Sequence, residues 1–122
     1  MSRYDTITNP HQGQYKKVLC VCSVGCLRSP TAAWVLSNEP FNYNTRACGI
    51  ERNNAIIVVD TVLLYWANEI IVFDYVVQSK IYNKLAKEDI TEKTLINLDI
   101  PDDYDYRDPV LCQLIYDRYL NA

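Results

Sequence analysis

The chain has 122 residues, the length of one ordinary domain, and it can bury an apolar core without disulfide or metal staples. Hydrophobic residues make up 49% and charged residues 22%, which excludes disordered, collagen-like and coiled-coil chains. Twelve Lys and Arg against fifteen Asp and Glu give a net charge of −3. Proteins that bind the nucleic-acid backbone usually carry an excess of basic residues, so this charge disfavours such a function. No apolar run reaches the roughly 18 residues of a membrane span, and residues 1–17 lack the apolar stretch of a signal peptide. We expect a cytoplasmic protein with a flexible leader at 1–14, a single domain at 15–122, and neither nucleic acid nor membrane as a partner.

The cysteines and the lone histidine restrict the chemistry. An odd number of cysteines without a secretory signal predicts reduced thiols: Cys20, Cys22, Cys26, Cys48 and Cys112. Zinc is disfavoured because no Cys-x2-Cys pair exists and the sole histidine, His11, stands in a polar tail. One histidine so placed also disfavours Cys-His and Ser-His-Asp catalysis, so acid–base chemistry must use carboxylates.

The first half of the chain predicts a strand, a loop, a helix and a strand. Residues 17–21 are a short apolar run of β-formers, and a glycine-containing segment follows at 22–28. Ser29-Pro30 has the pattern of a helix N-cap followed by proline at the first helical position, with the helix running to Leu36. Residues 38–40 end that helix, and residues 43–48 form the second strand.

The second half continues the alternation. Asp60 caps a helix at 61–67, which leads into a strand at 70–73 that Asp74 ends. A third helix runs to about Lys87 because apolar residues recur at helical spacing: Val76, Val77, Ile81 and Leu85. A fourth strand at 94–98 and an acidic loop at 99–108 precede a last helix that opens at Asp108-Pro109. Four apolar residues of this helix should face the core: Leu111, Leu114, Ile115 and Leu120.

Four alternations of strand and helix with short connections predict a parallel α/β sheet with helices on both faces. Such sheets bind ligands at the carboxyl ends of their strands, near a topological switch point. The first strand ends at Cys22, so the chemically unusual segment of the chain lies where this fold class places its sites.

The segment Cys22-x5-Arg28-Ser29 is suited to hold an anion and to present a thiol. A loop curling around one point directs backbone N–H groups inward, the following helix adds its positive end, and Arg28 supplies a planar fork for two phosphate oxygens. Gly25 permits the left-handed backbone of such a curl. The expected phosphate-binding residues are Ser23, Val24, Gly25, Cys26, Leu27, Arg28 and Ser29. The positive potential of these N–H groups, the helix end and Arg28 favours ionisation of the Cys22 thiol, and the Ser29 hydroxyl can donate a hydrogen bond to the thiolate. The alternative is a buried, inert Cys22 and a surface Arg28.

The run Cys22-Ser-Val-Gly-Cys-Leu-Arg28-Ser29-Pro-Thr-Ala resembles the phosphate loop of low-molecular-weight protein tyrosine phosphatases. It is closer to the small predicted protein tyrosine phosphatases of bacteria and phages, which share Trp-Ala-Asp-x-Ile and Ile-Pro-Asp-Asp-Tyr segments. Here these read Trp66-Ala-Asn-Glu-Ile70 and Ile100-Pro-Asp-Asp-Tyr104. The likeness spans about residues 17–120. It implies a three-layer α/β/α fold with a four-stranded parallel sheet in the order 2-1-3-4.

The resemblance implies hydrolysis of a phosphate monoester through a phosphocysteine, with no metal or cofactor. Cys22 is then the nucleophile, Arg28 the clamp on the phosphoryl oxygens and Ser29 the stabiliser of the thiolate. Alignment with the family's Asp-Pro-Tyr motif indicates Asp102 as the general acid, with Asp103 as the rival. Tyr104 and Tyr106 are candidates for an aromatic wall beside the substrate. Expected ligands are a phosphorylated protein or a small phosphomonoester, and inorganic phosphate in the loop.

The chain departs from the family at two positions. Gly25 stands where the family often has an Asn that braces the loop. Cys26 stands one place before the family's second cysteine, so whether Cys26 protects Cys22 from oxidation stays open.

Two other functions are alternatives to the phosphatase. An arsenate reductase of this fold needs a downstream cysteine pair, and no cysteine lies between Cys48 and Cys112. A phosphate-binding module without catalysis is the other alternative. The Cys-Ser…Arg-Ser pattern also resembles phosphatases that act on phosphoserines of the RNA polymerase tail, which leaves the substrate open.

Overall fold

The computed structural model describes residues 15–23, 27–50 and 58–122. The predicted leader at 1–14 lies outside these ranges. Strands and helices alternate strictly along the described chain, in the order β1 (Lys17–Cys22), α1 (Arg28–Ser37), β2 (Asn44–Gly49), α2 (Thr61–Trp66), β3 (Glu69–Val72), α3 (Tyr75–Lys87), β4 (Thr94–Asn97) and α4 (Pro109–Leu120).

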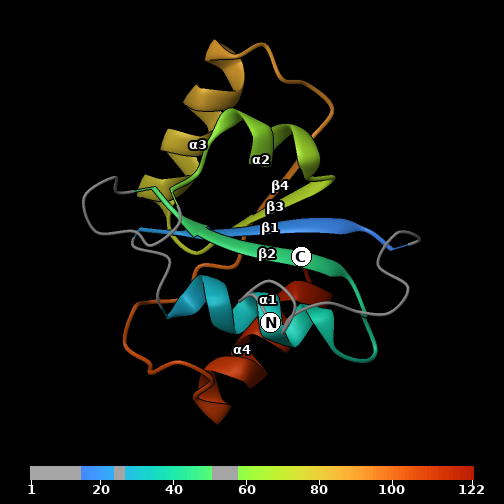
Figure 1. The fold of residues 1–122 in the computed structure, drawn as a ribbon. Coiled ribbons are helices and arrows are strands. Elements are labelled where there is room, and N and C mark those ends of the chain that lie inside the picture. Colours follow the sequence, from blue (N-terminus) through green and yellow to red (C-terminus); the bar gives the residue numbers. More distant parts are fainter. Residues whose placement is uncertain (1–14, 24–26, 51–57) are drawn as a thin grey trace.

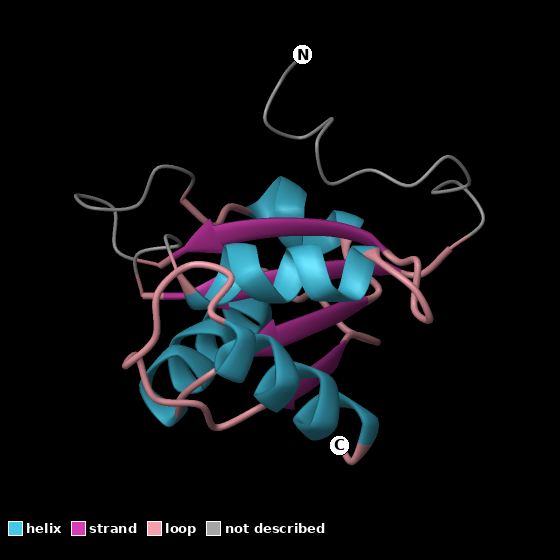
Figure 2. Ribbon diagram, turned by 90° about the horizontal axis from the view of Figure 1, so that it is seen from below, coloured by secondary structure: helices cyan, strands magenta, loops and turns pink. Residues whose placement is uncertain are grey.

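The four strands form one parallel sheet in the order β2-β1-β3-β4. Helices α1 and α4 cover one face of this sheet and α2 and α3 cover the other, so three layers result (Figure 1). Figure 2, which views the molecule from the α1 and α4 side, shows these two helices in front of the strands. The predicted fold class and strand order are confirmed. None of the helices in the described ranges is long and apolar enough to cross a lipid bilayer.

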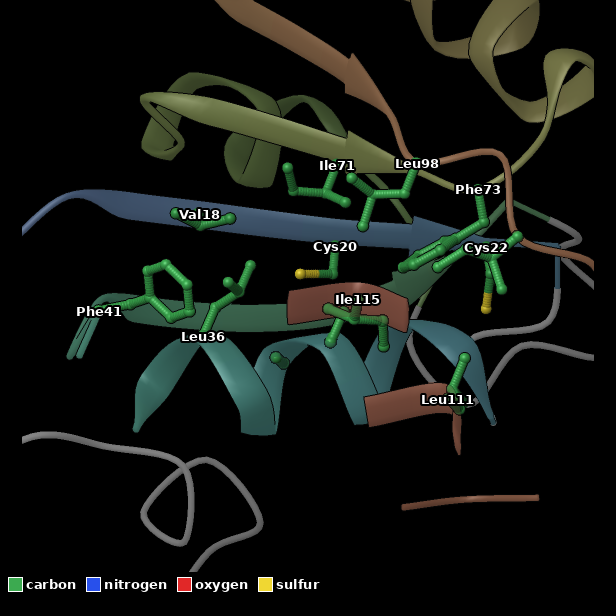
Figure 3. Packing of buried hydrophobic residues seen from close by; sticks show 13 residues of the cluster. Val18, Cys20, Cys22, Leu36, Phe41, Ile71, Phe73, Leu98, Leu111 and Ile115 are labelled. Atoms are coloured by element: carbon green, nitrogen blue, oxygen red, sulfur yellow. The ribbon is translucent and has the colours of Figure 1, made fainter. Parts of the chain in front are cut away.

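The central strand β1 divides the apolar core into two halves because successive side chains point to opposite faces. Val18, Cys20 and Cys22 pack on the side of α1 and α4, whereas Leu19 and Val21 pack on the side of α2 and α3. Figure 3 shows the first half, in which Cys22 stands at the carboxyl end of β1. The sulfur of Cys22 therefore lies on the α1 side of the sheet, at the edge where parallel strands end.

Asp60 caps the start of its helix as predicted, and Asp74 and Asp108 also cap the helices that follow them. The side chains of Asp60, Asp74 and Asp108 accept hydrogen bonds from the backbone N–H groups of Leu63, Val77 and Val110. Capping of this kind satisfies N–H groups that have no partner within the helix. Asp74 was predicted only to end its strand, and the structure adds the cap.

The prediction of which apolar residues of α4 face the core is partly wrong. Leu111 and Ile115 are buried and Leu114 packs against them, but Leu120 is 56% exposed. At 100° per residue, nine positions separate Leu120 from Leu111 by half a turn of the helix, so it lies on the opposite side. Tyr119, four positions after Ile115, continues the stripe instead. The same geometry applies in α3, where Val77, Ile81 and Leu85 are buried and Val76 is exposed.

Candidate active site

Cys22 and Ser29 meet where β1 ends and α1 begins. The Cys22 Sγ atom lies 3.1 Å from Ser29 Oγ, and both side chains are buried. Ser29 Oγ also donates to the backbone carbonyl of Cys48 at 3.3 Å. The serine hydroxyl has one proton and two neighbouring acceptors. It can therefore donate to a Cys22 thiolate, or accept from a Cys22 thiol while donating to the Cys48 carbonyl.

The prediction that Ser29 caps α1 is wrong. The helix begins at Arg28 with Leu27 at the N-cap position, and no side chain caps it. Ser29 stands inside the first turn, and its hydroxyl is turned away from the helix N–H groups toward the sulfur of Cys22 and the carbonyl of Cys48. The serine that sequence rules assign to a cap is thus used to contact the thiol.

Arg28 is buried, with 4% of its surface exposed. Its Nη1 atom donates to the carbonyl of Ile100 at 2.9 Å, and its Nη2 atom lies 3.3 Å from the carboxylate of Asp74. Its Nε atom lies 3.7 Å from Oδ1 of Asp102 but has no hydrogen-bond partner among the described residues. The Phe73 ring lies 5.7 Å from the guanidinium carbon. The alternative of a surface arginine is therefore wrong.

A buried guanidinium N–H group without a partner in the described part of the chain is an unusual feature. An unmade hydrogen bond of a buried charged donor costs free energy, so proteins usually pair such groups. The Nε donor of Arg28, which has no hydrogen-bond partner within the described ranges, faces Asp102, whose side chain is 57% exposed. An oxyanion that entered from this exposed side would satisfy the Nε donor with a charge-assisted hydrogen bond.

Asp74 is a residue of this site that the sequence prediction missed. One carboxylate oxygen caps α3 at Val77 and the other faces Arg28. The sequence did hold a signal, because Asp74 follows the strand that pairs with β1 across the topological switch point. A polar residue directly after that strand is expected to lie near the residues that follow β1.

The acidic loop brings one of the two candidate acids to Arg28. Asp102 pairs with Arg28, whereas Asp103 is exposed and forms no ion pair with a residue in the described ranges. Tyr104 is partly buried and packs against the half of the apolar core that lies on the α1 and α4 side of the sheet. Tyr106 is 44% exposed, and the Arg107 guanidinium lies 5.0 Å from its ring.

The rest of the predicted phosphate loop is described only at its ends. Val24, Gly25 and Cys26 lie outside the described residues. Ser23 is half-buried, and its carbonyl accepts from the N–H of Ile50 at 3.0 Å. The carbonyl of Leu27 accepts from the hydroxyl of Thr31 at 2.6 Å.

The other buried thiols differ from Cys22 in their surroundings. Burial raises the pKa of Cys20 well above its usual range, and it raises the pKa of Cys48 in the same way. Both thiols therefore stay protonated and unreactive at neutral pH. Within the described part of the chain, no group of three or more His, Cys, Asp and Glu side chains is arranged to hold a metal ion.

Comparisons with protein-family models, with curated proteins and with solved structures found no match to this chain. The arrangement itself is a sulfur in contact with a hydroxyl, beside a buried guanidinium that faces two carboxylates. A thiol, a guanidinium and a carboxyl group are the chemical groups that can attack as a nucleophile, bind an oxyanion and transfer a proton.

Proposed function

We propose that the protein is a cysteine-dependent phosphate monoester hydrolase of the protein tyrosine phosphatase type, similar to the low-molecular-weight phosphatases. The observation that carries the proposal is the contact of Cys22 with Ser29 directly beside the buried Arg28, whose Nε donor has no hydrogen-bond partner among the described residues. Cys20, Cys48 and Cys112 carry free thiols, which is in keeping with a reducing cytoplasm, where a nucleophilic thiol stays active.

In the first step, the Cys22 thiolate attacks the phosphorus of the substrate. A sulfur–phosphorus bond forms and the bond between phosphorus and the leaving oxygen breaks. Arg28 stabilises the charge on the transferring phosphoryl oxygens, a task for which a planar guanidinium is well shaped. Asp102, in its protonated form, gives its proton to the leaving oxygen.

In the second step, water attacks the phosphocysteine. The Asp102 carboxylate, now without its proton, accepts a proton from this water as the oxygen–phosphorus bond forms. The sulfur–phosphorus bond breaks, inorganic phosphate leaves, and the Ser29 hydroxyl donates to the returning thiolate. Each group thus ends the cycle in the state in which it began.

Asp102 must give up its contact with Arg28 when a substrate arrives. A phosphate dianion placed between the two would replace the carboxylate as the partner of the guanidinium and would favour the protonated carboxyl group. The exposure of Asp102 makes this exchange inexpensive, since a half-exposed ion pair contributes little stability.

The test is the hydrolysis of p-nitrophenyl phosphate by the wild-type chain and by the Cys22→Ser variant. We expect turnover by the wild type and none by the variant, together with a phosphorylated Cys22 peptide after acid quenching. A wild type that binds inorganic phosphate but shows no turnover above the variant would overturn the hydrolase and favour the phosphate-binding module.

A further inference from the structure

The loop that carries Asp102 is fastened to the rest of the molecule at both ends. At its start, the N–H of Ile100 donates to the carbonyl of Phe73 at 3.0 Å, and the carbonyl of Ile100 accepts from Arg28. At its end, the N–H of Arg107 donates to the hydroxyl of Thr31 at 3.0 Å. Asp102 stands between these two attachments.

The second attachment includes a stacked side chain. The guanidinium carbon of Arg107 lies 4.4 Å from the centre of the Trp34 ring and 5.0 Å from that of Tyr106. A guanidinium over an aromatic face is attracted by the ring quadrupole and packs as a flat group against it. Arg107 therefore links the loop to the middle of α1.

Arg107 also has a backbone conformation that must be held in place. Its φ angle is +60°, in the left-handed region that disfavours residues with a Cβ atom by roughly 1–2 kcal/mol. Such a conformation persists where the surrounding contacts enforce it, and it is found often at functional sites. Here the contacts with Thr31 and Trp34 enforce it.

Helix α1 connects this attachment to the reacting groups. Arg28 and Ser29 form its first turn, and Thr31 and Trp34 follow within the next two turns. A rigid helix therefore fixes the end of the acidic loop relative to the thiol and the guanidinium. Among the described residues, the exposed carboxylate of Asp102 pairs only with Nε of Arg28, at 3.7 Å, which is a weak restraint.

We propose that Arg107, which stacks on the ring of Trp34, is a positioning residue that holds Asp102 in place for proton transfer. The inference rests on the proposed function, and it adds a residue that neither touches the substrate nor belongs to the phosphate loop. Loss of the contact between Arg107 and Trp34 leaves Cys22 and Arg28 in place but displaces Asp102. The defect is then specific to substrates whose leaving group needs a proton.

The experiment compares kcat/KM for two aryl phosphates, because kcat/KM reports the attack of the cysteine and the departure of the leaving group. Phenyl phosphate has a basic leaving group that needs the acid, whereas p-nitrophenyl phosphate has one that needs little protonation. In Arg107→Asn we expect a loss of about 10-fold with phenyl phosphate and under about 2-fold with p-nitrophenyl phosphate, as a displaced general acid predicts. Asn also accepts a positive φ, so the backbone is spared.

Two further variants separate positioning from folding. Trp34→Phe keeps an aromatic face and should retain most of the activity with phenyl phosphate, whereas Trp34→Leu should lose it as Arg107→Asn does. Arg46→Gln is the matched control, since Arg46 stacks on Trp66 at 4.8 Å and Trp66 belongs to α2, on the other face of the sheet. It should leave the ratio of the two substrates unchanged.

An equal loss with both substrates, or no loss, in Arg107→Asn would overturn the inference while leaving the hydrolase in place. A wild-type chain without turnover that depends on Cys22 would overturn the proposed function, and the inference with it.

Discussion

The carboxylate of Asp74 lies 3.3 Å from Nη2 of Arg28, although 46 positions separate the two residues in the chain. Its other oxygen caps the first turn of α3. Asp74 thereby joins the starts of two helices that cover opposite faces of the sheet. It also gives the buried guanidinium a charged partner at Nη2, so that the neighbouring Nε donor keeps its direction.

The first prediction concerns this pair. Asp74→Asn keeps an oxygen for the cap but removes the charge that orients Arg28, so kcat/KM for p-nitrophenyl phosphate should fall by about 10-fold through loss of orientation. Asp60→Asn is the matched control, because Asp60 caps α2 in the same way. Asn is as good a cap as Asp. Steady-state kinetics measure both, and equal activities in the two variants would remove Asp74 from the site.

The sequence predicts the fold well because the fold depends on local patterns. Short apolar strands, capping aspartates and helical spacing gave the predicted boundaries to within two residues, the largest difference being at the start of α1. The alternation of strands and helices then allows few arrangements, and parallel crossover connections restrict them further. The error at Leu120 has a local cause too, since it followed from the apolar character of the residue and not from its angle on the helix.

The site was predicted less completely because its contacts join distant residues. Cys22, Arg28 and Ser29 could be found from their spacing, and Asp102 from the resemblance. No spacing rule links Arg28 to Asp74. The stacking of Arg107 on Trp34 likewise arises only when α1 and the acidic loop come together in the folded chain.

The second prediction tests the hydroxyl beside the sulfur. Ser29→Ala removes a hydroxyl that can donate to a Cys22 thiolate, and a hydrogen bond to a charged group is worth roughly 1.5–3 kcal/mol. We expect alkylation of Cys22 by iodoacetamide at pH 7 to slow by about 10-fold or more, as measured by mass spectrometry of the Cys22 peptide. Ser37→Ala, at the far end of the same helix, is the control. An unchanged rate in Ser29→Ala would show that the hydroxyl does not stabilise the thiolate.

The third prediction concerns stability at alkaline pH. Burial raises the pKa of Cys20 above the value of 9.0 that an exposed thiol has. Above pH 9 the thiol ionises in the unfolded chain but not in the folded one, so the unfolded state gains stability as pH rises. The free energy of unfolding should therefore fall above pH 9, by up to about 1.4 kcal/mol per pH unit for this thiol.

Urea denaturation under reducing conditions, between pH 8 and 10.5, measures this slope. Cys20→Ala should show a shallower decline than the wild type. Val21→Ala opens a comparable space in the same buried strand without removing a thiol, so it should keep the wild-type slope. Parallel declines in the wild type and Cys20→Ala would mean that this thiol ionises equally in both states.

The fourth prediction separates the two neighbouring aspartates. Asp102 lies beside Arg28 and Asp103 does not, so Asp102→Asn should lower kcat for phenyl phosphate by about 100-fold or more, the usual effect of losing a general acid. Without the acid, the basic limb of the pH profile should flatten, because that limb reports loss of the donated proton. Asp103→Asn, one position along the same loop, should retain both the rate and the bell-shaped profile. The reverse result, a flat basic limb in Asp103→Asn alone, would assign proton transfer to Asp103 and would mean that the Arg28–Asp102 pair serves only to hold the loop.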